Sequence, residues 1–385
     1  MKIDWDAYKA RFIAPRDTIY LLGNSLGLYS PEAEAGLLKA ISHWREHGIN
    51  GFMAEGAEWF AWAERIGELL APLVGASAQE CVPANSTTVN LHQLLATLYE
   101  PIGDKKRILI DRSAFPSDSY AVQSFLAVRG CPEALKVVEP AGRLLDADQI
   151  VEALTEEVAL VLLPAVVYTT GQLLPVERIA RACQDRGATF LLDCSHSIGA
   201  VPHRLHDWGV DGAFWCSYKY LNAGPGSPGG LFLHSKHFGR RPGLAGWFGS
   251  DKSRQMEMTF EMIPAMGAGA MQIGSPPVLA FGALEASLKM IDEVGIENIR
   301  ARSLELTERM IALCPLPIAT PRLADQRGGH VSIVHPQAAG IQEELQKRGV
   351  MTDFRNPDIV RMAPNPMYNS MDEVERAMTI LAGIV

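Results

Sequence analysis

A lysine flanked by two tyrosines is the first feature of this sequence that could do chemistry. It lies in the segment WCSYKYLNAGPGSPGG (215–230), where apolar residues precede Lys219 and glycine and proline follow it. A lysine in apolar surroundings loses its charge more readily than one in water, and its amine then becomes a nucleophile. The ordinary alternative is a surface lysine whose stem packs on apolar neighbours.

Two adjacent threonines could hold a phosphate. Thr87 and Thr88, in NSTTVNLH (85–92), open an apolar-periodic helix after a loop. Free backbone N–H groups, hydroxyls and the helix dipole at such a position attract anions. A threonine there is as often a simple helix N-cap, so the pattern alone leaves both roles open.

Further polar residues follow strand-like runs. Asp193, in DCSH (193–196), ends an apolar run, where an unpaired carboxylate is costly and should meet a cation or hydrogen-bond donors. A turn cap is the alternative for this residue. Taken singly, Phe115 would be a core residue, and Asp118 and His196 would be structural polar residues.

One cofactor would use all of these groups together. Pyridoxal phosphate carries a phosphate, an aromatic ring, a basic ring nitrogen and an aldehyde. Lys219 would form a Schiff base with the aldehyde, and Asp193 would keep the ring nitrogen protonated so that the ring can accept electrons. The separation of 26 residues between them leaves room for one further strand, which puts both at the carboxyl edge of a sheet.

The elements that would position these residues alternate between strands and helices. Helical patterns near 117–129 and 175–186 separate some of the β-rich runs at 107–110, 158–163, 188–192, 212–216 and 229–233. This alternation predicts an α/β fold with a mainly parallel, mixed sheet flanked by helices. Ligands of such sheets bind at the carboxyl ends of the strands.

A second, smaller α/β domain is expected after this core. Long helices at about 277–293 and 295–313 lead to strand-like runs at 330–335 and 358–363, and Ser370 with Glu373 forms a capping box for a last helix. Before the core, one more helix is expected to start at Ser30 and Pro31 and to end at Gly48. We therefore predict an N-terminal segment (1–50) that packs with the small domain, a large cofactor-binding domain (51–280) and a small C-terminal domain (281–385).

Two other motifs lack the structural context that their known functions require. GPGSPG (224–229) matches a dinucleotide-binding pattern, but a strand rather than a helix follows it. HWREH (43–47) matches an inverted zinc-protease pattern, but no distal third ligand can be assigned. The six cysteines show no metal-binding spacing, so the sequence predicts no metal site.

Composition narrows the class of protein. The chain has 385 residues, 48% of them hydrophobic and 21% charged, which is typical of a globular protein large enough for two domains. A net charge of -9 argues against a nucleic-acid partner. No run approaches the ~18 apolar residues of a membrane span, and we expect a cytoplasmic protein with reduced cysteines.

Several motifs taken together resemble those of the kynureninase family, within the fold-type-I, class V group of pyridoxal-phosphate enzymes. The resemblance runs from about residue 20 to the C-terminus, and the run CSYKYLNAGPG together with GWFG is its most specific part. It rests on LGNSLGL (22–28), TVNLH (88–92), FPSD (115–118), Asp193 with His196, CSYKYLNAGPG (216–226), GWFG (246–249) and RMAPNPMYNS (361–370). The resemblance implies a homodimer with a shared active site.

The family's functional residues map onto this sequence one by one. The resemblance implies that Lys219, Tyr218 and Asp193 are catalytic and that the substrate meets Arg361, whose guanidinium suits a carboxylate, together with Asn24 and Ser25. Tyr218 is either an acid/base group or a group that orients the cofactor. The implied cofactor-binding residues are Thr87, Thr88, Phe115, Pro116, Ser117, Asp118, Asp193, His196, Tyr218, Lys219 and, from the neighbouring subunit, Trp247 and Ser275.

The implied reaction is hydrolysis of L-kynurenine, or of its 3-hydroxy derivative, to L-alanine and the corresponding anthranilate. Ser275 and Ser250 depart from the family's usual residues, which leaves side-chain specificity open. The segment 43–62, with His43, Asn50, Phe52, Trp59 and Trp62, is expected to contribute to the aryl pocket. Alternatives are another class V enzyme, such as a cysteine desulfurase, lyase or aminotransferase, or a non-catalytic protein that binds the cofactor.

Overall fold

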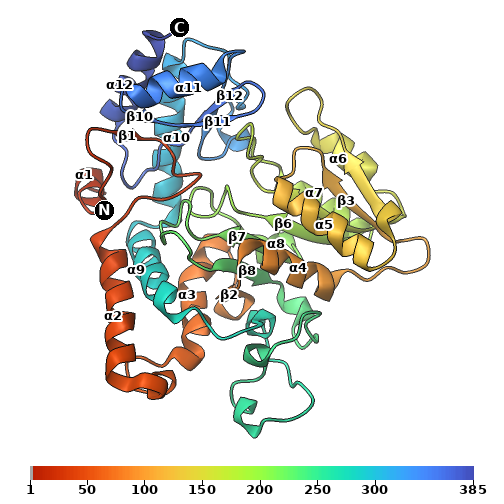
Figure 1. Ribbon diagram of the computed structural model, residues 1–385. Coiled ribbons are helices and arrows are strands. Elements are labelled where there is room, and N and C mark those ends of the chain that lie inside the picture. The colour runs from red at the N-terminus through yellow and green to blue at the C-terminus, as the bar shows by residue number, and fades with distance from the viewer. Residues whose placement is uncertain (1–2) are drawn as a thin grey trace.

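A seven-stranded sheet forms the centre of the computed structural model, which describes residues 3–385 (Figure 1). All strands run parallel except β8, which is antiparallel to both of its neighbours. The mainly parallel, mixed sheet predicted from the sequence is thereby confirmed. In spatial order the strands are β2 (Cys81–Ala84), β8 (Gly229–Leu233), β7 (Gly212–Cys216), β6 (Thr189–Asp193), β5 (Val158–Pro164), β3 (Arg107–Asp111) and β4 (Leu135–Val138).

Helices alternate with these strands and pack against the sheet. α4 contacts β7 and β8, and α7 contacts β6. α4 follows β2 after a short loop and α5 follows β3, so each helix starts just beyond the end of a strand. The helices of this part are α3 (Trp62–Val74), α4 (Thr87–Leu98), α5 (Pro116–Val128), α6 (Ala147–Ala153), α7 (Val176–Asp185) and α8 (Leu205–Trp208).

Two long helices, α2 (Pro31–His47) and α9 (Val278–Val294), run side by side along one flank of the molecule (Figure 1). The Ser30 hydroxyl caps α2 by accepting the Ala33 N–H at 3.2 Å. Gly36 and Gly282 face each other so closely that a Cβ on Gly36 would lie 2.1 Å from the Gly282 carbonyl oxygen. This contact brings the two backbones together and fixes where the N-terminal segment lies.

The C-terminal part has its own antiparallel sheet and hydrophobic core. The order of its strands is β11 (Asp353–Arg355), β12 (Ile359–Met362) and β9 (Val331–Val334). Near the N-terminus, after α1 (Trp5–Lys9), β1 (Ile19–Tyr20) pairs in parallel with β10 (Val350–Met351). The boundaries of the three segments stay a prediction. The accompanying helices are α10 (Ile296–Leu313), α11 (Ala338–Lys347) and α12 (Met371–Ala382), which carries the predicted capping box.

The described residues contain no helix that is both long enough and apolar enough to cross a membrane. All six cysteines are unpaired, and four of them are buried. HWREH lies on the last turns of α2, and the strand β8 begins at Gly229, the last residue of GPGSPG.

Candidate active site

A cavity of about 220 Å³ lies beyond the carboxyl ends of β6 and β7, where α4 and α5 begin. It gathers residues from both ends of the chain and from the centre. Twelve of the predicted site residues line it: Asn24, Ser25, Thr87, Thr88, Phe115, Ser117, Asp118, Asp193, His196, Tyr218, Lys219 and Arg361.

Lys219 is a buried residue in the wall of this cavity. Its Nζ lies 3.1 Å from His196 Nε2 and 5.9 Å from the ring centroid of Phe115. Burial, and then the positive charge of Lys219, holds the pKa of His196 well below its ordinary value. A neutral imidazole can accept a hydrogen bond from the lysine amine, so His196 orients Lys219 without adding charge.

Two carboxyl groups face the same space. Asp193 is the last residue of β6, and its Oδ1 accepts the Ser195 N–H at 2.8 Å. Asp118 lies in the first turn of α5, where burial, and then the negative charge of Asp193, raises the pKa of Asp118 well above its ordinary value. The pair therefore favours one negative charge, and the cavity can hold a cationic group against it.

Hydroxyl groups collect at the start of α4. Thr87 Oγ1 donates to the Trp215 carbonyl at 3.2 Å and lies 3.1 Å from Cys216 Sγ. Thr88 Oγ1 and Ser117 Oγ are 2.6 Å apart and connect the first turns of α4 and α5. Free N–H groups of a helix start and these hydroxyls are a suitable donor set for a phosphate.

Tyr218 reaches the same end of the cavity. Its hydroxyl oxygen is 3.3 Å from Cys216 Sγ. Burial, and then Cys216, raises the pKa of the Tyr218 phenol above its ordinary value. Tyr218 is therefore a phenol near neutral pH, able to donate a hydrogen bond or a proton.

Arg361 is almost completely buried and firmly held. Its Nε and Nη2 donate to Asp353 Oδ1 and Oδ2 at 2.7 and 2.5 Å, and its Nη1 donates to the Tyr168 carbonyl at 2.8 Å. Ser25 Oγ donates to Asp353 Oδ2 at 2.7 Å. Burial alone would raise the pKa of Asp353, but Arg361 outweighs it and the pKa is lowered. Asp353 thus occupies the Nε and Nη2 side of the guanidinium, and the second Nη2 N–H donates to Ser25 Oγ at 3.3 Å. One N–H of Nη1 is left for a ligand, and the Nη2 N–H that meets Ser25 can join it if that hydroxyl turns away.

Three lining residues were not predicted: Ser195, Cys216 and Arg355. Ser195 lies within DCSH and Cys216 begins CSYKYLNAGPG, so the positions of both were readable from those motifs. No sequence pattern indicated that Arg355 would line the cavity, because its position depends on the pairing of β11 with β12. Its Nη2 lies 3.1 Å from Asp353 Oδ2, so one carboxylate is shared by two arginines.

Some predicted residues lie elsewhere in this chain. Pro116 begins α5 next to the lining residues. Trp247 is 46% exposed and lines a separate cavity of about 140 Å³, and Ser275 is exposed. The proposed aryl segment also lies outside the site cavity: His43 and Trp62 line another cavity of about 450 Å³.

The donor set fits pyridoxal phosphate. The cavity offers an amine, a half-exposed aromatic face at Phe115, a carboxylate at a strand end and a helix start with hydroxyls. Two buried polar atoms of lining residues, His196 Nδ1 and Asn24 Nδ2, have no partner within the described residues. A bound polar group can satisfy such atoms, which are costly when left unpaired.

Comparison with known proteins decides the family. The chain is 44% identical to a kynureninase from Geobacillus thermodenitrificans and 43% identical to one from Bacillus anthracis, in each case over 98% of this chain and 91% of the relative. The chain belongs to the kynureninase family. A model of the kynureninase C-terminal domain matches residues 299–381, and a model of the DegT/DnrJ/EryC1/StrS aminotransferase family matches residues 58–209. The resemblance indicated by the motifs is confirmed.

Solved structures support the fold independently. A C-DES variant with glycine covalently linked to its pyridoxal-phosphate cofactor has a TM-score of 0.84 at 19% identity, over 97% of this chain and 98% of that one. A cysteine desulfurase from Thermococcus onnurineus also has a TM-score of 0.84, at 18% identity, over 100% of this chain and 98% of that one. At these identities the match shows the fold alone, so the kynureninase relatives carry the functional comparison.

Proposed function

We propose that this enzyme uses pyridoxal phosphate to hydrolyse L-kynurenine, or 3-hydroxy-L-kynurenine, to L-alanine and anthranilate or 3-hydroxyanthranilate. The observation that carries the proposal is that Lys219, Asp193 and Arg361 line one cavity in a chain of the kynureninase family. The three groups have distinct roles, because the lysine amine would meet the cofactor aldehyde, the aspartate would face the ring nitrogen and the arginine would bind the substrate carboxylate.

The residues that would hold the cofactor surround the cavity. Thr87, Thr88 and Ser117 would bind the phosphate, Phe115 would stack on the ring, and Asp193 would pair with the ring nitrogen. Asp118 and His196 would contact the polar groups of the ring. When bound, pyridoxal phosphate supplies an aldehyde for the substrate amine and a ring that withdraws electrons from the substrate Cα.

The chain's own groups would then move protons. Lys219 would take the proton from the substrate Cα and hold it near the reacting atoms, with His196 orienting its amine. Water would add to the γ-carbonyl of the substrate, and the Cβ–Cγ bond would then break. The aryl part would leave as anthranilate or 3-hydroxyanthranilate, and Cβ would take up a proton on the way to alanine. Tyr218 lines the same cavity as a protonated phenol, so it would donate a proton in these steps or orient the neighbouring groups.

Arg361 would fix the substrate by its α-carboxylate. Asp353 and the Tyr168 carbonyl already hold the guanidinium in place, so little rotamer entropy remains to be lost on binding. Ser25 and Asn24 line the same end of the cavity and would contact the substrate beside Arg361.

The proposal includes a homodimer with a shared active site, in the cytoplasm. Trp247 and Ser275 would complete the phosphate end of the neighbouring subunit's site. The exposed position of both residues outside the cavity of their own chain supports this arrangement.

The decisive experiment is an assay of the wild-type protein with pyridoxal phosphate. We expect kynurenine or 3-hydroxykynurenine to yield the fluorescent anthranilate product and an equal amount of alanine. Cysteine, and amino acids offered with keto acids, serve as parallel substrates. Release of sulfide from cysteine, or efficient transamination, without cleavage of either kynurenine would contradict the proposal and favour another class V activity.

A further inference from the structure

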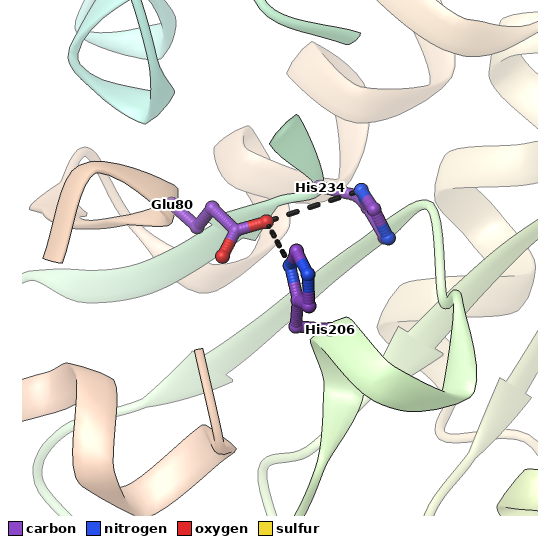
Figure 2. Close-up of side chains that lie close together, drawn as sticks. All are labelled: Glu80, His206 and His234. Atoms are coloured by element: carbon purple, nitrogen blue, oxygen red, sulfur yellow. Dashed lines mark hydrogen bonds and ion pairs between the residues drawn. The ribbon is translucent and has the colours of Figure 1, made fainter. Parts of the chain in front are cut away.

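A carboxylate and two imidazoles meet at a place that the catalytic proposal does not use. Glu80, His206 and His234 offer ligand atoms that all lie within 4.8 Å of one another, and no other such group occurs among residues 3–385 (Figure 2). Glu80 ends a short 3-10 helix before β2, His206 lies in α8, and His234 follows β8. Because β8 runs antiparallel to β7, the end of β8 lies at the edge of the sheet opposite to the active-site cavity.

We propose that these three residues bind a divalent transition-metal ion, with Zn²⁺ as the expected occupant and water as the fourth ligand. Imidazole and carboxylate ligands suit Zn²⁺, whereas Mg²⁺ and Ca²⁺ prefer sites built from oxygen alone. The site is independent of the cofactor and of the catalytic reaction.

The distances from the two imidazoles to the carboxylate fit one tetrahedral ion. His206 Nδ1 and His234 Nδ1 lie 2.8 and 3.9 Å from the same carboxylate oxygen, Glu80 Oε1. With Zn–ligand bonds of about 2.0–2.2 Å, two ligands of a tetrahedral zinc are about 3.3 Å apart, so shifts of roughly half an ångström would bring each imidazole nitrogen to that distance from the carboxylate oxygen. The two nitrogens themselves lie within 4.8 Å of each other. The two rings stack with centroids 4.7 Å apart, and both Nδ1 atoms face the oxygen (Figure 2).

Glu80 supplies a fixed negative charge. It is fully buried, and burial alone would raise its pKa, but hydrogen bonds from Ser77, His206 and the Ser235 N–H lower the pKa to about 2. Oε2 is held by the backbone and hydroxyl of Ser77, and Oε1 accepts the Ser235 N–H at 2.8 Å. At Glu80, an ion would therefore replace only the hydrogen bond between Oε1 and His206.

His234 is available as a neutral ligand. Burial, and then the charge of Lys236, lowers its pKa, so the ring is uncharged near neutral pH. Its Nδ1 now accepts the Lys236 N–H at 3.1 Å, and giving up that bond costs about 0.5–1.5 kcal/mol. The Lys236 ammonium is itself engaged by Asp211 at 2.8 Å, which offsets its repulsion of a cation.

His206 completes the site from the solvent side. Its side chain is 45% exposed, which gives the ion an entry path and leaves room for a water ligand. Binding requires the proton on Nδ1 to leave, and Nε2 can carry it instead. An ion held by all three residues would connect the 3-10 helix before β2, α8 and the end of β8.

The test titrates Zn²⁺ into holoenzyme that has lost its purification tag and has been treated with a chelator and desalted. Calorimetry should show one saturable site per chain, and Zn²⁺ should raise the unfolding temperature while Mg²⁺ should not. His206→Ala should weaken the binding by at least about tenfold, a minimum for the loss of a direct ligand. Cofactor absorbance and turnover should remain those of the wild type, because the site lies at the opposite edge of the sheet.

Two further variants test whether Zn²⁺ binds at these three residues and not elsewhere. His206→Gln keeps a hydrogen-bond donor for Glu80 but removes the ring, so it should retain stability without Zn²⁺ and lose zinc binding. His43→Ala removes a histidine from another close pair, His43 and His47, whose ring centroids are 6.0 Å apart, and it should bind Zn²⁺ as the wild type does. Absence of saturable binding to the wild type, undiminished affinity in His206→Gln, or loss of the site in His43→Ala instead would each overturn the proposal.

Discussion

The pairing of Asp118 with Asp193 gives different roles to two carboxyl groups of one cavity. The raised pKa of Asp118 leaves Asp193 as the anion that would face the cofactor's ring nitrogen. Asp193→Asn should therefore fold and bind the cofactor, but lower kcat by about 10²–10³-fold, the usual cost of losing one electrostatic group at a reacting centre. Steady-state kinetics with matched cofactor absorbance checks this, and near wild-type turnover would refute the role of Asp193.

Asp353 holds Arg361 in the orientation in which it would bind the substrate carboxylate. Asp353→Asn removes the charge and one acceptor, so Arg361 should lose its orientation. We expect KM for kynurenine to rise by about tenfold or more, since a charged hydrogen bond contributes about 1.5–3 kcal/mol. Cofactor absorbance should not change.

The control for this prediction is a ligand without the carboxylate. The decarboxylated analogue of kynurenine should bind to Asp353→Asn and to the wild type equally well, because it never meets Arg361. Equal weakening for both ligands would mean that Asp353 supports the cavity in general and does not position Arg361.

Asp111, the last residue of β3, gives a pH dependence whose sign is fixed. Burial raises the pKa of this fully buried carboxyl to about 7, above its ordinary value of 3.8. The folded state then binds more protons than the unfolded state between those values, so stability falls as the pH rises through that window. Asp111→Asn removes this titration.

The wild type should therefore lose about 1–3 kcal/mol of unfolding free energy from pH 5 to pH 8 that Asp111→Asn does not lose. Urea unfolding of the holoenzyme at both pH values measures the difference. Parallel pH profiles for the two proteins would show that Asp111 is not the titrating group.

At the scale of the elements, the contact between α2 and α9 depends on two glycines. A methyl group at position 36 would overlap the Gly282 carbonyl, and backbone cannot yield as a side chain can. Gly36→Ala should therefore lower the unfolding free energy by about 1–3 kcal/mol despite the better helix propensity of alanine.

Gly340 of α11 offers the matched control, because nothing lies within 4 Å of a Cβ placed there. Gly340→Ala should be neutral or stabilising by up to about 1 kcal/mol. Thermal unfolding of both variants separates the two effects. If Gly36→Ala proved as stable as Gly340→Ala, the close approach of α2 and α9 would not be a stability determinant.

Local chemistry explains which elements the sequence predicts well. The N-cap, N1 proline and terminal glycine of α2 all act within a few residues, and β7 and β8 have the predicted bounds. The strand β2, CVPA, was not predicted because it is short and contains a proline, and only its pairing with β8 makes it a strand. β11 and the placement of Arg355 likewise depend on tertiary pairing.

The same distinction applies to the functional residues. Motifs of a few consecutive residues, such as FPSD or SYKY, reveal several cavity-lining residues at once. Asp353 is separated from Ser25 by most of the chain, and Glu80 from His206 by 126 residues, so no spacing reveals either contact. Such contacts exist only once the sheet and the small C-terminal sheet are assembled.

At the scale of the whole molecule, the proposed shared active site predicts that two defective chains can restore each other's activity. Lys219 lines the cavity of its own chain, whereas Trp247 lies outside it and would serve the neighbouring subunit. A dimer of Lys219→Ala with Trp247→Ala therefore has one site with both defects and one with neither. The single-variant dimers carry one defect in every site.

The test mixes the two variants after mild dissociation, or produces them in the same cells. Activity is assayed at limiting cofactor, because weaker phosphate binding in Trp247→Ala lowers activity most under that condition. Random pairing makes half of the dimers mixed, so about one quarter of wild-type activity should return. Light scattering should give twice the chain mass of 42.0 kDa. Activity no greater than the average of the two separate variants would place Trp247 in the site of its own chain or outside any site, while a monomeric mass would remove the shared site altogether.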